Sequence, residues 1–128
     1  MKQSSSWLAL AACATVVLTP AADAQQSELP AGVTEQMISE GAAIFKGAGT
    51  CFACHGPDAK GIPNLGANLT DNEWTHADGS YESIVETINR GAQAESGALM
   101  PPKGGPNLSE EQVRAVAAYV WSLSNRSQ

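Results

Sequence analysis

One pentapeptide, Cys51-Phe52-Ala53-Cys54-His55, constrains this chain more than any other feature of its sequence. Both thiols fit on one turn of a helix, and an imidazole follows at once. The third cysteine, Cys13, leaves no second pair from which to build a two-bridge scaffold. Two cysteines so close together cannot join distant segments, so something else is expected to occupy both sulfurs.

This spacing is the signature of covalent haem attachment. Each thiol can add to one vinyl group of a haem, and the imidazole that follows then lies under the iron as its proximal ligand. A thioredoxin-like redox pair requires strand–helix–strand surroundings, and a zinc site requires two further ligands, for which only His76 is a candidate. We therefore predict one covalent haem c held by Cys51 and Cys54, with His55 as an axial ligand of the iron.

The second axial ligand is predicted to be Met100, in the stretch Gly97-Ala98-Leu99-Met100-Pro101-Pro102. It lies 45 residues beyond His55, in a loop that can fold over the opposite face of a haem. The two prolines stiffen that loop. The alternative ligand is His76, although a lone histidine in a polar setting is more often exposed, and Met37 belongs to a helix face. Since His/Met ligation leaves no open position at the iron, we expect an electron-transfer protein rather than an enzyme.

The first 24 residues have the pattern of an export signal. Lys2 gives a positive n-region, residues 7–18 form an apolar h-region, and Ala22-Asp23-Ala24 predicts cleavage after Ala24 and a periplasmic location. The apolar run is shorter than the roughly 18 to 20 residues that span a bilayer, so no stable membrane insertion is expected. The alternative is a lipid anchor on Cys13, because the residues before it resemble a lipidation site.

The chain is acidic, with a formal net charge of −6 at pH 7. Removal of the predicted signal leaves six basic and twelve acidic side chains, so nucleic acid is not an expected partner. Haem propionates would add further negative charge. We expect redox partner proteins that present a basic docking patch, with an attraction that salt weakens.

Helical periodicity recurs in three segments, and no strand pattern reaches four alternating residues. The predicted helices begin after N-caps at Thr34, Ser80 and Ser109. Gly47 and Gly91 are expected to end the first two helices. The third carries its buried face on Val113, Val116, Ala117, Val120 and Leu123.

Between the helices the chain is rich in glycine, proline and asparagine. Residues 56–69 and 92–108 are expected to be irregular loops, and a capping-box pattern predicts a short helical turn over 70–74. Residues 25–33 are interpreted as a flexible N-terminal arm, and residues 34–125 as one domain. The predicted fold class is all-α, with three main helices, a short helical turn and long loops packed around one haem. Because large aromatic side chains are few, the haem would supply part of the core.

Over residues 34–125 these features resemble the class I c-type cytochromes, which carry one haem. Gly41 and Phe45 match the family's glycine and aromatic pair in the first helix. The resemblance implies that this pair crosses the last helix at Val116 and Tyr119. A glycine at such a crossing lets two helix backbones approach closely.

Further stretches are similar to the haem domain of the cytochrome c subunit of C-family haem-copper oxidases. They are Asn68-Leu69-Thr70-Asp71-Asn72 with Trp74, Met100-Pro101, and residues 117–124. The resemblance implies that Trp74 donates its indole N–H to a haem propionate, and Arg90 is a second candidate for that contact. The family usually has a proline about twelve residues after the ligand histidine, whose carbonyl accepts the other ring N–H. Ala67 stands at that place here, and its carbonyl can do the same.

Taken together, these residues predict a periplasmic monohaem cytochrome that carries single electrons between redox partners by outer-sphere transfer. The alternative is a dedicated haem subunit of a periplasmic dehydrogenase or oxidase complex. An obligate subunit exposes a sizeable apolar face when isolated, whereas a carrier exposes only a small apolar ring around the haem edge. A haem peroxidase or gas-binding protein would need a vacant position at the iron, against which Met100 argues.

Overall fold

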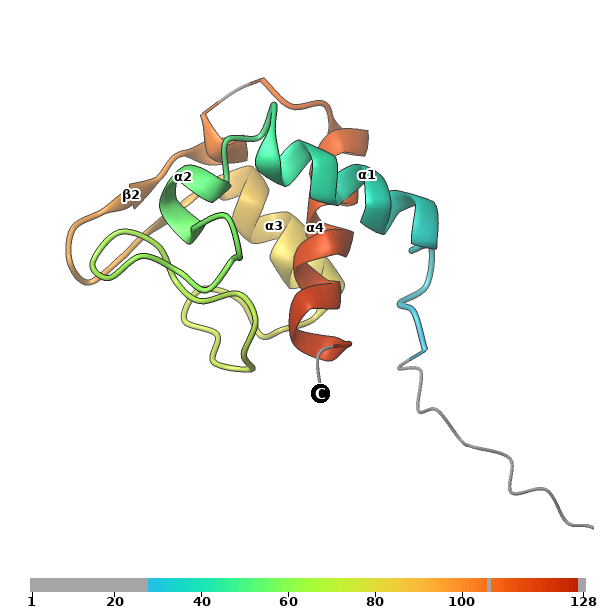
Figure 1. Cartoon of the computed structure of the whole chain (residues 1–128), viewed down its shortest axis with the longest axis horizontal. Coiled ribbons are helices and arrows are strands. Elements are labelled where there is room, and N and C mark those ends of the chain that lie inside the picture. The colour runs from blue at the N-terminus through green and yellow to red at the C-terminus, as the bar shows by residue number, and fades with distance from the viewer. Residues whose placement is uncertain (1–27, 106, 127–128) are drawn as a thin grey trace, which may run out of the picture.

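The computed structural model describes residues 28–105 and 107–126 of the 128-residue chain. The predicted signal peptide and the lipid-anchor alternative lie outside these residues. The described part is mostly helical, with three main helices, as predicted (Figure 1). The elements in chain order are α1 (Glu35–Lys46), α2 (Phe52–His55), α3 (Tyr81–Arg90), β1 (Ala92–Gln93), β2 (Leu99–Met100), the 3₁₀ turn η1 (Pro102–Gly104) and α4 (Glu110–Asn125).

Each main helix begins at the residue that its sequence predicts. The side chains of Thr34, Ser80 and Ser109 each accept a hydrogen bond from the backbone N–H three residues later. At Ser109 the bond is reciprocal, because the Gln112 side chain accepts from the Ser109 backbone N–H at 2.9 Å. A cap of this kind stabilises a helix by about 1 kcal/mol. The three predicted N-caps are confirmed.

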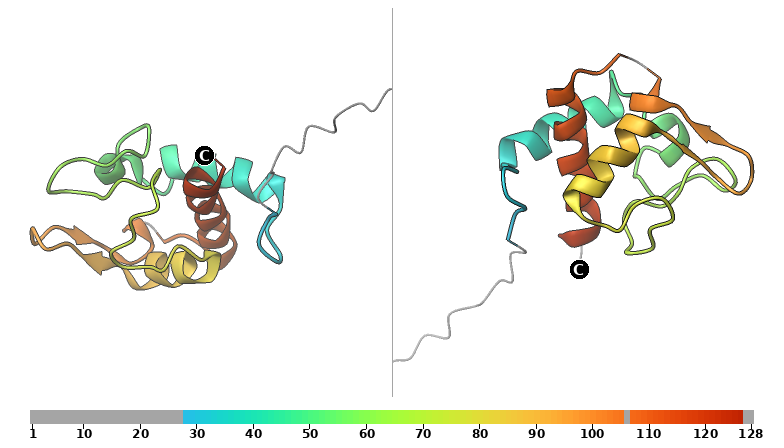
Figure 2. Two further views of the ribbon diagram at one scale, coloured as in Figure 1. Left: turned by 90° about the horizontal axis from the view of Figure 1, so that it is seen from below. Right: turned by 180° about the vertical axis from the view of Figure 1, so that it is seen from behind.

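The helix α4 is the centre of the fold, because α1 crosses one side of it and α3 packs against another (Figures 1 and 2). At the crossing with α1, a Cβ on Gly41 would lie 2.0 Å from the Ala115 carbonyl oxygen. Next to it, Phe45 and Tyr119 make an edge-to-face aromatic pair with ring centroids 5.4 Å apart. The crossing itself was predicted, but it is the Ala115 backbone that Gly41 meets most closely.

More of α4 is buried than one amphipathic face would allow. Ala115, Ala118 and Trp121 are buried in addition to the predicted positions, while Leu123 is only half-buried. The reason is that neighbours cover the helix from more than one side. Val33, which precedes α1, is also buried and joins the same core.

The helical turn predicted over 70–74 does not form, and the chain there makes bends instead. The Asn68 side chain accepts hydrogen bonds from the backbone N–H and the hydroxyl of Thr70, at 2.9 and 2.7 Å. The Asp71 carboxylate accepts from the Glu73 backbone N–H at 3.1 Å. Because the Glu73 N–H, which the Thr70 hydroxyl oxygen would accept from in a helix cap, donates to Asp71 instead, the cap does not form, and the prediction of a helical turn at this place is wrong.

The segment 92–108, predicted to be wholly irregular, contains a small β-hairpin followed by η1. Its strands β1 and β2 pair in antiparallel register, with Ala92 opposite Met100 and Gln93 opposite Leu99. Each strand has only two residues, which is too short for alternation to be visible in the sequence.

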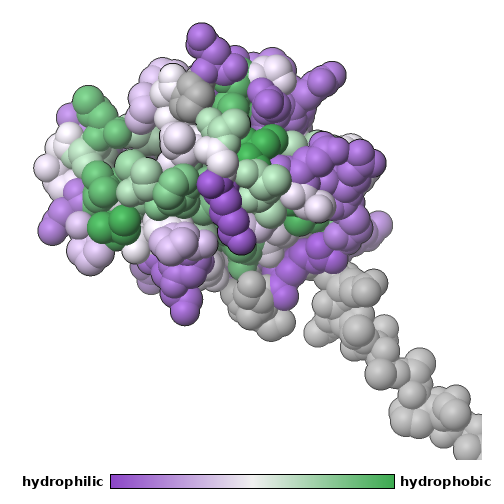
Figure 3. Space-filling model, turned by 45° about the horizontal axis from the view of Figure 1, so that its top comes forward, coloured by the Kyte–Doolittle hydropathy of each residue, from purple (hydrophilic) through white to green (hydrophobic). Residues whose placement is uncertain are grey.

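The surface of the molecule is uneven in hydropathy (Figure 3). Hydrophobic residues gather on the left, where Figure 1 places α2, the loop after it and β2, and hydrophilic residues gather over α1 on the right. Among the described residues, the exposed large hydrophobic side chains are Phe52, Ile62, Leu65 and Leu99. All four belong to the α2 helix, its following loop or the hairpin, so the apolar surface lies on one side.

Candidate functional site

The described part of the chain forms an open-sided cavity of about 460 Å³, within the size range of sites for small molecules and cofactors. Phe45 of α1, Ile84 and Ile88 of α3, and Val116 and Val120 of α4 give it an apolar wall. The remaining wall comes from α2, the loop 64–69, the bends around Trp74 and the hairpin. The cavity therefore lies where the loops meet the core, on the apolar side of the molecule.

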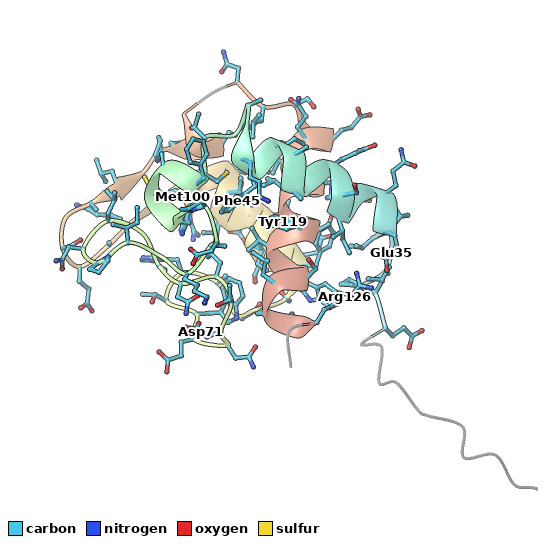
Figure 4. The ribbon with its side chains drawn as sticks, viewed as in Figure 1. Glu35, Phe45, Asp71, Met100, Tyr119 and Arg126 are labelled. Atoms are coloured by element: carbon cyan, nitrogen blue, oxygen red, sulfur yellow. The ribbon has the colours of Figure 1, made fainter. Side chains whose placement is uncertain are left out.

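The pentapeptide and Met100 approach the cavity from opposite sides. Seen from below (Figure 2, left), α2 and its following loop lie apart from β1 and β2, and residues from both segments line the cavity. Cys51, Cys54 and His55 belong to the first segment, and Met100 belongs to the second. Figure 4 shows Met100 on this side, far from the Glu35–Arg126 ion pair at the opposite end of the molecule. The fold thus brings together all four residues predicted to hold a haem.

The two thiols lie along α2, where Cys51 is the N-cap and Cys54 is the second-to-last residue of the helix. Both are half-buried and neither is part of a disulfide. Burial raises the pKa of the Cys51 thiol, and its Sγ lies 3.5 Å from the Gly49 carbonyl oxygen. Two unpaired thiols on the wall of one apolar cavity fit the covalent attachment of a cofactor within it.

The imidazole of His55 is held by a hydrogen bond from Nδ1 to the Ala67 carbonyl oxygen, at 2.8 Å. Because a carbonyl can only accept, Nδ1 must carry the proton in this contact. The other ring nitrogen, Nε2, is then left with a lone pair that can bind a metal. The acceptor is the alanine that replaces the family's usual proline, so the substitution keeps the contact.

A glycine brings the loop close enough for this hydrogen bond to form. A Cβ on Gly66 would lie 2.3 Å from the Cys54 carbonyl oxygen, so a larger residue would push the loop away from α2. The loop is closed by paired backbone bonds between Ile62 and Gly66, each at 3.0 Å. Sequence reasoning missed the role of Gly66, because a glycine within a glycine-rich loop gives no sign of what it approaches.

Met100 is half-buried at the end of β2, where it lines the cavity. The base of the hairpin is packed tightly, because a Cβ on Gly91 would lie 2.5 Å from the Met100 carbonyl oxygen. Gly91 itself has φ +77°, which a glycine adopts without strain. The thioether is therefore presented by an ordered hairpin rather than by an open loop.

Trp74 and His76 both line the cavity. The Trp74 indole packs on Gly79, where a Cβ would lie 2.8 Å from Nε1, and no described residue accepts a hydrogen bond from this N–H. The Thr87 hydroxyl donates to the His76 carbonyl at 2.9 Å and fixes this segment on α3. Arg90 pairs with Glu86 at 3.5 Å and does not line the cavity. The structure therefore brings Trp74 to the site but not Arg90.

The charged side chains that line the cavity, among the residues described, are Glu73 and Glu95. Four of the basic side chains are engaged elsewhere in exposed ion pairs: Arg90 with Glu86, Lys103 with Glu110, Arg114 with Glu82, and Arg126 with Glu35. Among the residues that the structure describes, no lysine or arginine lines this cavity.

Comparison with known proteins gives a consistent result. Residues 36–120 match the family described as cytochrome C oxidase, cbb3-type, subunit III. The cbb3-type cytochrome c oxidase subunit CcoP of Rhodobacter capsulatus is 42% identical over 92 residues, covering 70% of this chain and 30% of that protein. Subunit FixP of Bradyrhizobium sp. is 45% identical over 85 residues, covering 65% of this chain and 26% of that protein. The chain thus spans less than a third of the length of these relatives.

Solved structures share the fold. Cytochrome CL from Methylophaga aminisulfidivorans is 28% identical, with a TM-score of 0.57, over 72% of this chain and 56% of that one. A chain of the Kuenenia stuttgartiensis reducing HAO-like protein complex has a TM-score of 0.56 at 19% identity, over 71% of this chain and 45% of that one. The second likeness concerns the fold alone.

Proposed function

Given that the chain belongs to the family of cbb3-type cytochrome c oxidase subunit III, we propose that it passes single electrons as the haem-bearing component of a periplasmic oxidoreductase complex. It is a cytochrome c domain homologous to the haem subunit of cbb3 oxidases, and this family implies a covalent haem c. The observation that carries the proposal is the meeting of Cys51, Cys54, His55 and Met100 at one apolar cavity. When bound there, the haem supplies a one-electron iron couple.

In this proposal Cys51 and Cys54 hold the cofactor by thioether bonds, so that a small domain keeps it without enclosing it fully. His55 gives the iron a nitrogen ligand through Nε2, because its Nδ1 is already engaged with the Ala67 carbonyl. That contact keeps the ring from rotating. Both effects hold the site in one arrangement, which suits electron transfer because little has to move between oxidation states.

Met100 gives the thioether ligand from the opposite wall, where the two prolines that follow it restrict the backbone. His55 and Met100 would then be the two protein ligands of the iron, and the protein would leave no position at the metal for a substrate. The wall formed by α1, α3 and α4 is apolar and offers no ionisable side chain to this region. These features support outer-sphere transfer and disfavour binding of a substrate at the metal.

Trp74 is proposed to donate its indole N–H to a haem propionate. The support is its place on the cavity wall and the lack of another acceptor among the described residues. Since it is the packing on Gly79 that sets the orientation of the ring, Trp74→Phe should keep the packing and remove only the donor. A changed reduction potential with unchanged haem content would support this role.

The sequence alone favoured a diffusible carrier, whereas the relatives named above support a dedicated haem component better. The apolar surface on the cavity side, with Leu99 67% exposed, agrees with a permanent protein neighbour on that side. Among residues 28–105 and 107–126, no helix has the length and apolar character needed to cross a membrane. A periplasmic location, with cleavage after Ala24, remains part of the proposal.

The test of function is an absorption spectrum of the exported protein in both oxidation states, with carbon monoxide then added to the reduced form. We expect c-type bands, a weak sulfur-to-iron band in the far red when oxidised, and no response to carbon monoxide. A high-spin spectrum that shifts on adding the gas would contradict His/Met ligation and favour a gas-binding or peroxidase function.

The assembly is tested separately by native electrophoresis of a detergent extract from the source cells, stained for haem and probed for this chain. Migration with a large complex that has oxidase or dehydrogenase activity is expected. Migration at the size of the isolated chain would favour the diffusible carrier instead.

A further inference from the structure

The hairpin that carries Met100 is exposed along most of its length. Its turn is closed by backbone hydrogen bonds from Ala94 to Ala98 and from Gly97 to Ala94, each at 2.9 Å. The side chain before Met100, Leu99, is 67% exposed, so apolar packing holds this end of the hairpin only weakly. A segment with few buried contacts opens locally at low free energy unless another interaction holds it.

One side-chain hydrogen bond joins the tip of this hairpin to the opposite side of the cavity. The Ser96 hydroxyl donates to the Asn64 carbonyl oxygen at 3.0 Å, between residues 32 positions apart. Asn64 has φ +62°, in the left-handed region that asparagine tolerates, and this conformation belongs to the turn closed by Ile62 and Gly66. The acceptor is thus a backbone atom in an ordered turn.

The same turn leads directly to the acceptor of His55. Ala67 follows Gly66 and accepts the Nδ1 hydrogen bond at 2.8 Å. A continuous path therefore runs from His55 through the turn 62–67 to Ser96 and then along the hairpin to Met100. The Ser96 bond is the link in this path between the two sides of the cavity.

We infer that Ser96 is a positioning residue that keeps the Met100 hairpin closed and so holds the thioether at the iron. The inference rests on the proposed function, because it assumes that His55 and Met100 are the axial ligands. The Ser96 hydroxyl does not touch the metal. It acts by lowering the fraction of molecules in which the hairpin, and with it Met100, has moved away.

Ser96→Ala removes the exposed hydrogen bond to Asn64, together with a longer contact within the hairpin in which the Ser96 oxygen accepts from the Ala98 backbone N–H at 3.4 Å, and the bond to Asn64 sets the size of the effect. Removing such a bond is expected to raise the open population about fivefold, within a range of roughly two- to tenfold. An external ligand that binds only the open form has an apparent affinity proportional to the open fraction. The affinity of the oxidised protein for imidazole should therefore rise by the same factor in Ser96→Ala.

The experiment compares haem-loaded wild type with Ser96→Ala, Ser96→Thr and Ser39→Ala. Imidazole is titrated into the oxidised proteins while the far-red sulfur-to-iron band is followed, and hydrogen exchange of the Ala94 and Gly97 amides is measured. Ser96→Thr keeps the hydroxyl and should stay within about twofold of wild type. Ser39 is exposed on α1, away from the hairpin, so Ser39→Ala is the matched control.

The outcomes separate the inference from the proposed function. Tighter imidazole binding and faster exchange in Ser96→Ala alone would support the inference. If wild type shows the sulfur-to-iron band but Ser96→Ala binds imidazole as wild type does, the inference is wrong, whether or not exchange is faster. If wild type itself lacks the sulfur-to-iron band, Met100 is not a ligand of the iron. The proposed ligation and the inference about Ser96 are then both wrong.

Discussion

Substituting Gly41 by alanine would test how the α1–α4 crossing supports the cavity. A Cβ there would lie 2.0 Å from the Ala115 carbonyl oxygen, 2.6 Å from its carbonyl carbon and 2.8 Å from the Tyr119 Cβ. Two of these atoms are backbone, so no side chain can rotate away. The helices must separate by about 1 Å even to reach a tight contact of 3.0 Å.

The magnitude combines three terms. Overpacking of a core costs about 1 to 3 kcal/mol, and a backbone obstruction belongs at the upper end of that range. Separation also weakens the Phe45–Tyr119 pair, whose edge-to-face contact contributes about 1 kcal/mol. Helix propensity acts in the other direction, because alanine is favoured over glycine by about 1 kcal/mol. The expected result is a loss of about 2 to 3 kcal/mol in the free energy of unfolding.

Urea denaturation of the haem-loaded protein, followed by far-ultraviolet circular dichroism, measures this loss. The midpoint should fall by about 1 M or more. The control is Ala43→Gly on the exposed side of the same helix, which should cost only the propensity difference of about 1 kcal/mol. A Gly41→Ala midpoint equal to or above that of wild type would refute the close approach of α1 and α4.

Three further changes probe the attachment site, the thioether ligand and the acid limit of stability. Replacing both Cys51 and Cys54 by alanine should abolish covalent haem, seen as loss of haem stain on a denaturing gel; retained stain would contradict the attachment site. Met100→Ala should keep the haem, lower the reduction potential and allow carbon monoxide to bind, whereas an unchanged potential in a redox titration would point to another ligand. Hydrogen bonds from Ser80 and Ser83 lower the pKa of Asp78 from 3.8 to about 2, so its carboxylate stabilises the fold fully above about pH 4 and loses this effect as the pH falls to about 2. Urea midpoints measured between pH 6 and pH 2 should therefore fall less in Asp78→Asn than in wild type, and equal slopes would show that Asp78 does not act in this way.

Local signals in the sequence were sufficient to predict where the three main helices begin. The hydroxyls of Thr34, Ser80 and Ser109 cap the helices because the bond is to a backbone N–H only three residues away. The cysteine pair and the histidine after it were recognised for the same reason, since their spacing on one turn already limits their chemistry. Met100 was predicted as a ligand although it lies 45 residues beyond His55 in the sequence, and the fold brings it to the same cavity.

Three other features of the structure could not be predicted from local sequence patterns. The pattern of Thr70 and Glu73 suggested a capped helical turn, but the Glu73 backbone N–H donates to Asp71 and the chain bends instead. The hairpin around Met100 was missed, because strands of two residues leave no periodicity to read. Arg90 was a second candidate for the propionate contact, and in the structure it pairs with Glu86 on the surface.

The sequence by itself determined the helices, their caps, the all-α class and the pentapeptide that suits haem attachment, because each rests on groups within about four residues of one another. Only the tertiary structure decided that Ala67 accepts from His55, that Gly66 lies against Cys54 and that Ser96 joins the hairpin to Asn64. These contacts link loops whose paths follow from how α1 and α3 pack on α4. Their partners are backbone atoms, which carry no residue identity, so the sequence pointed only to Ala67, through its place twelve residues after His55, and gave no sign of the other two contacts.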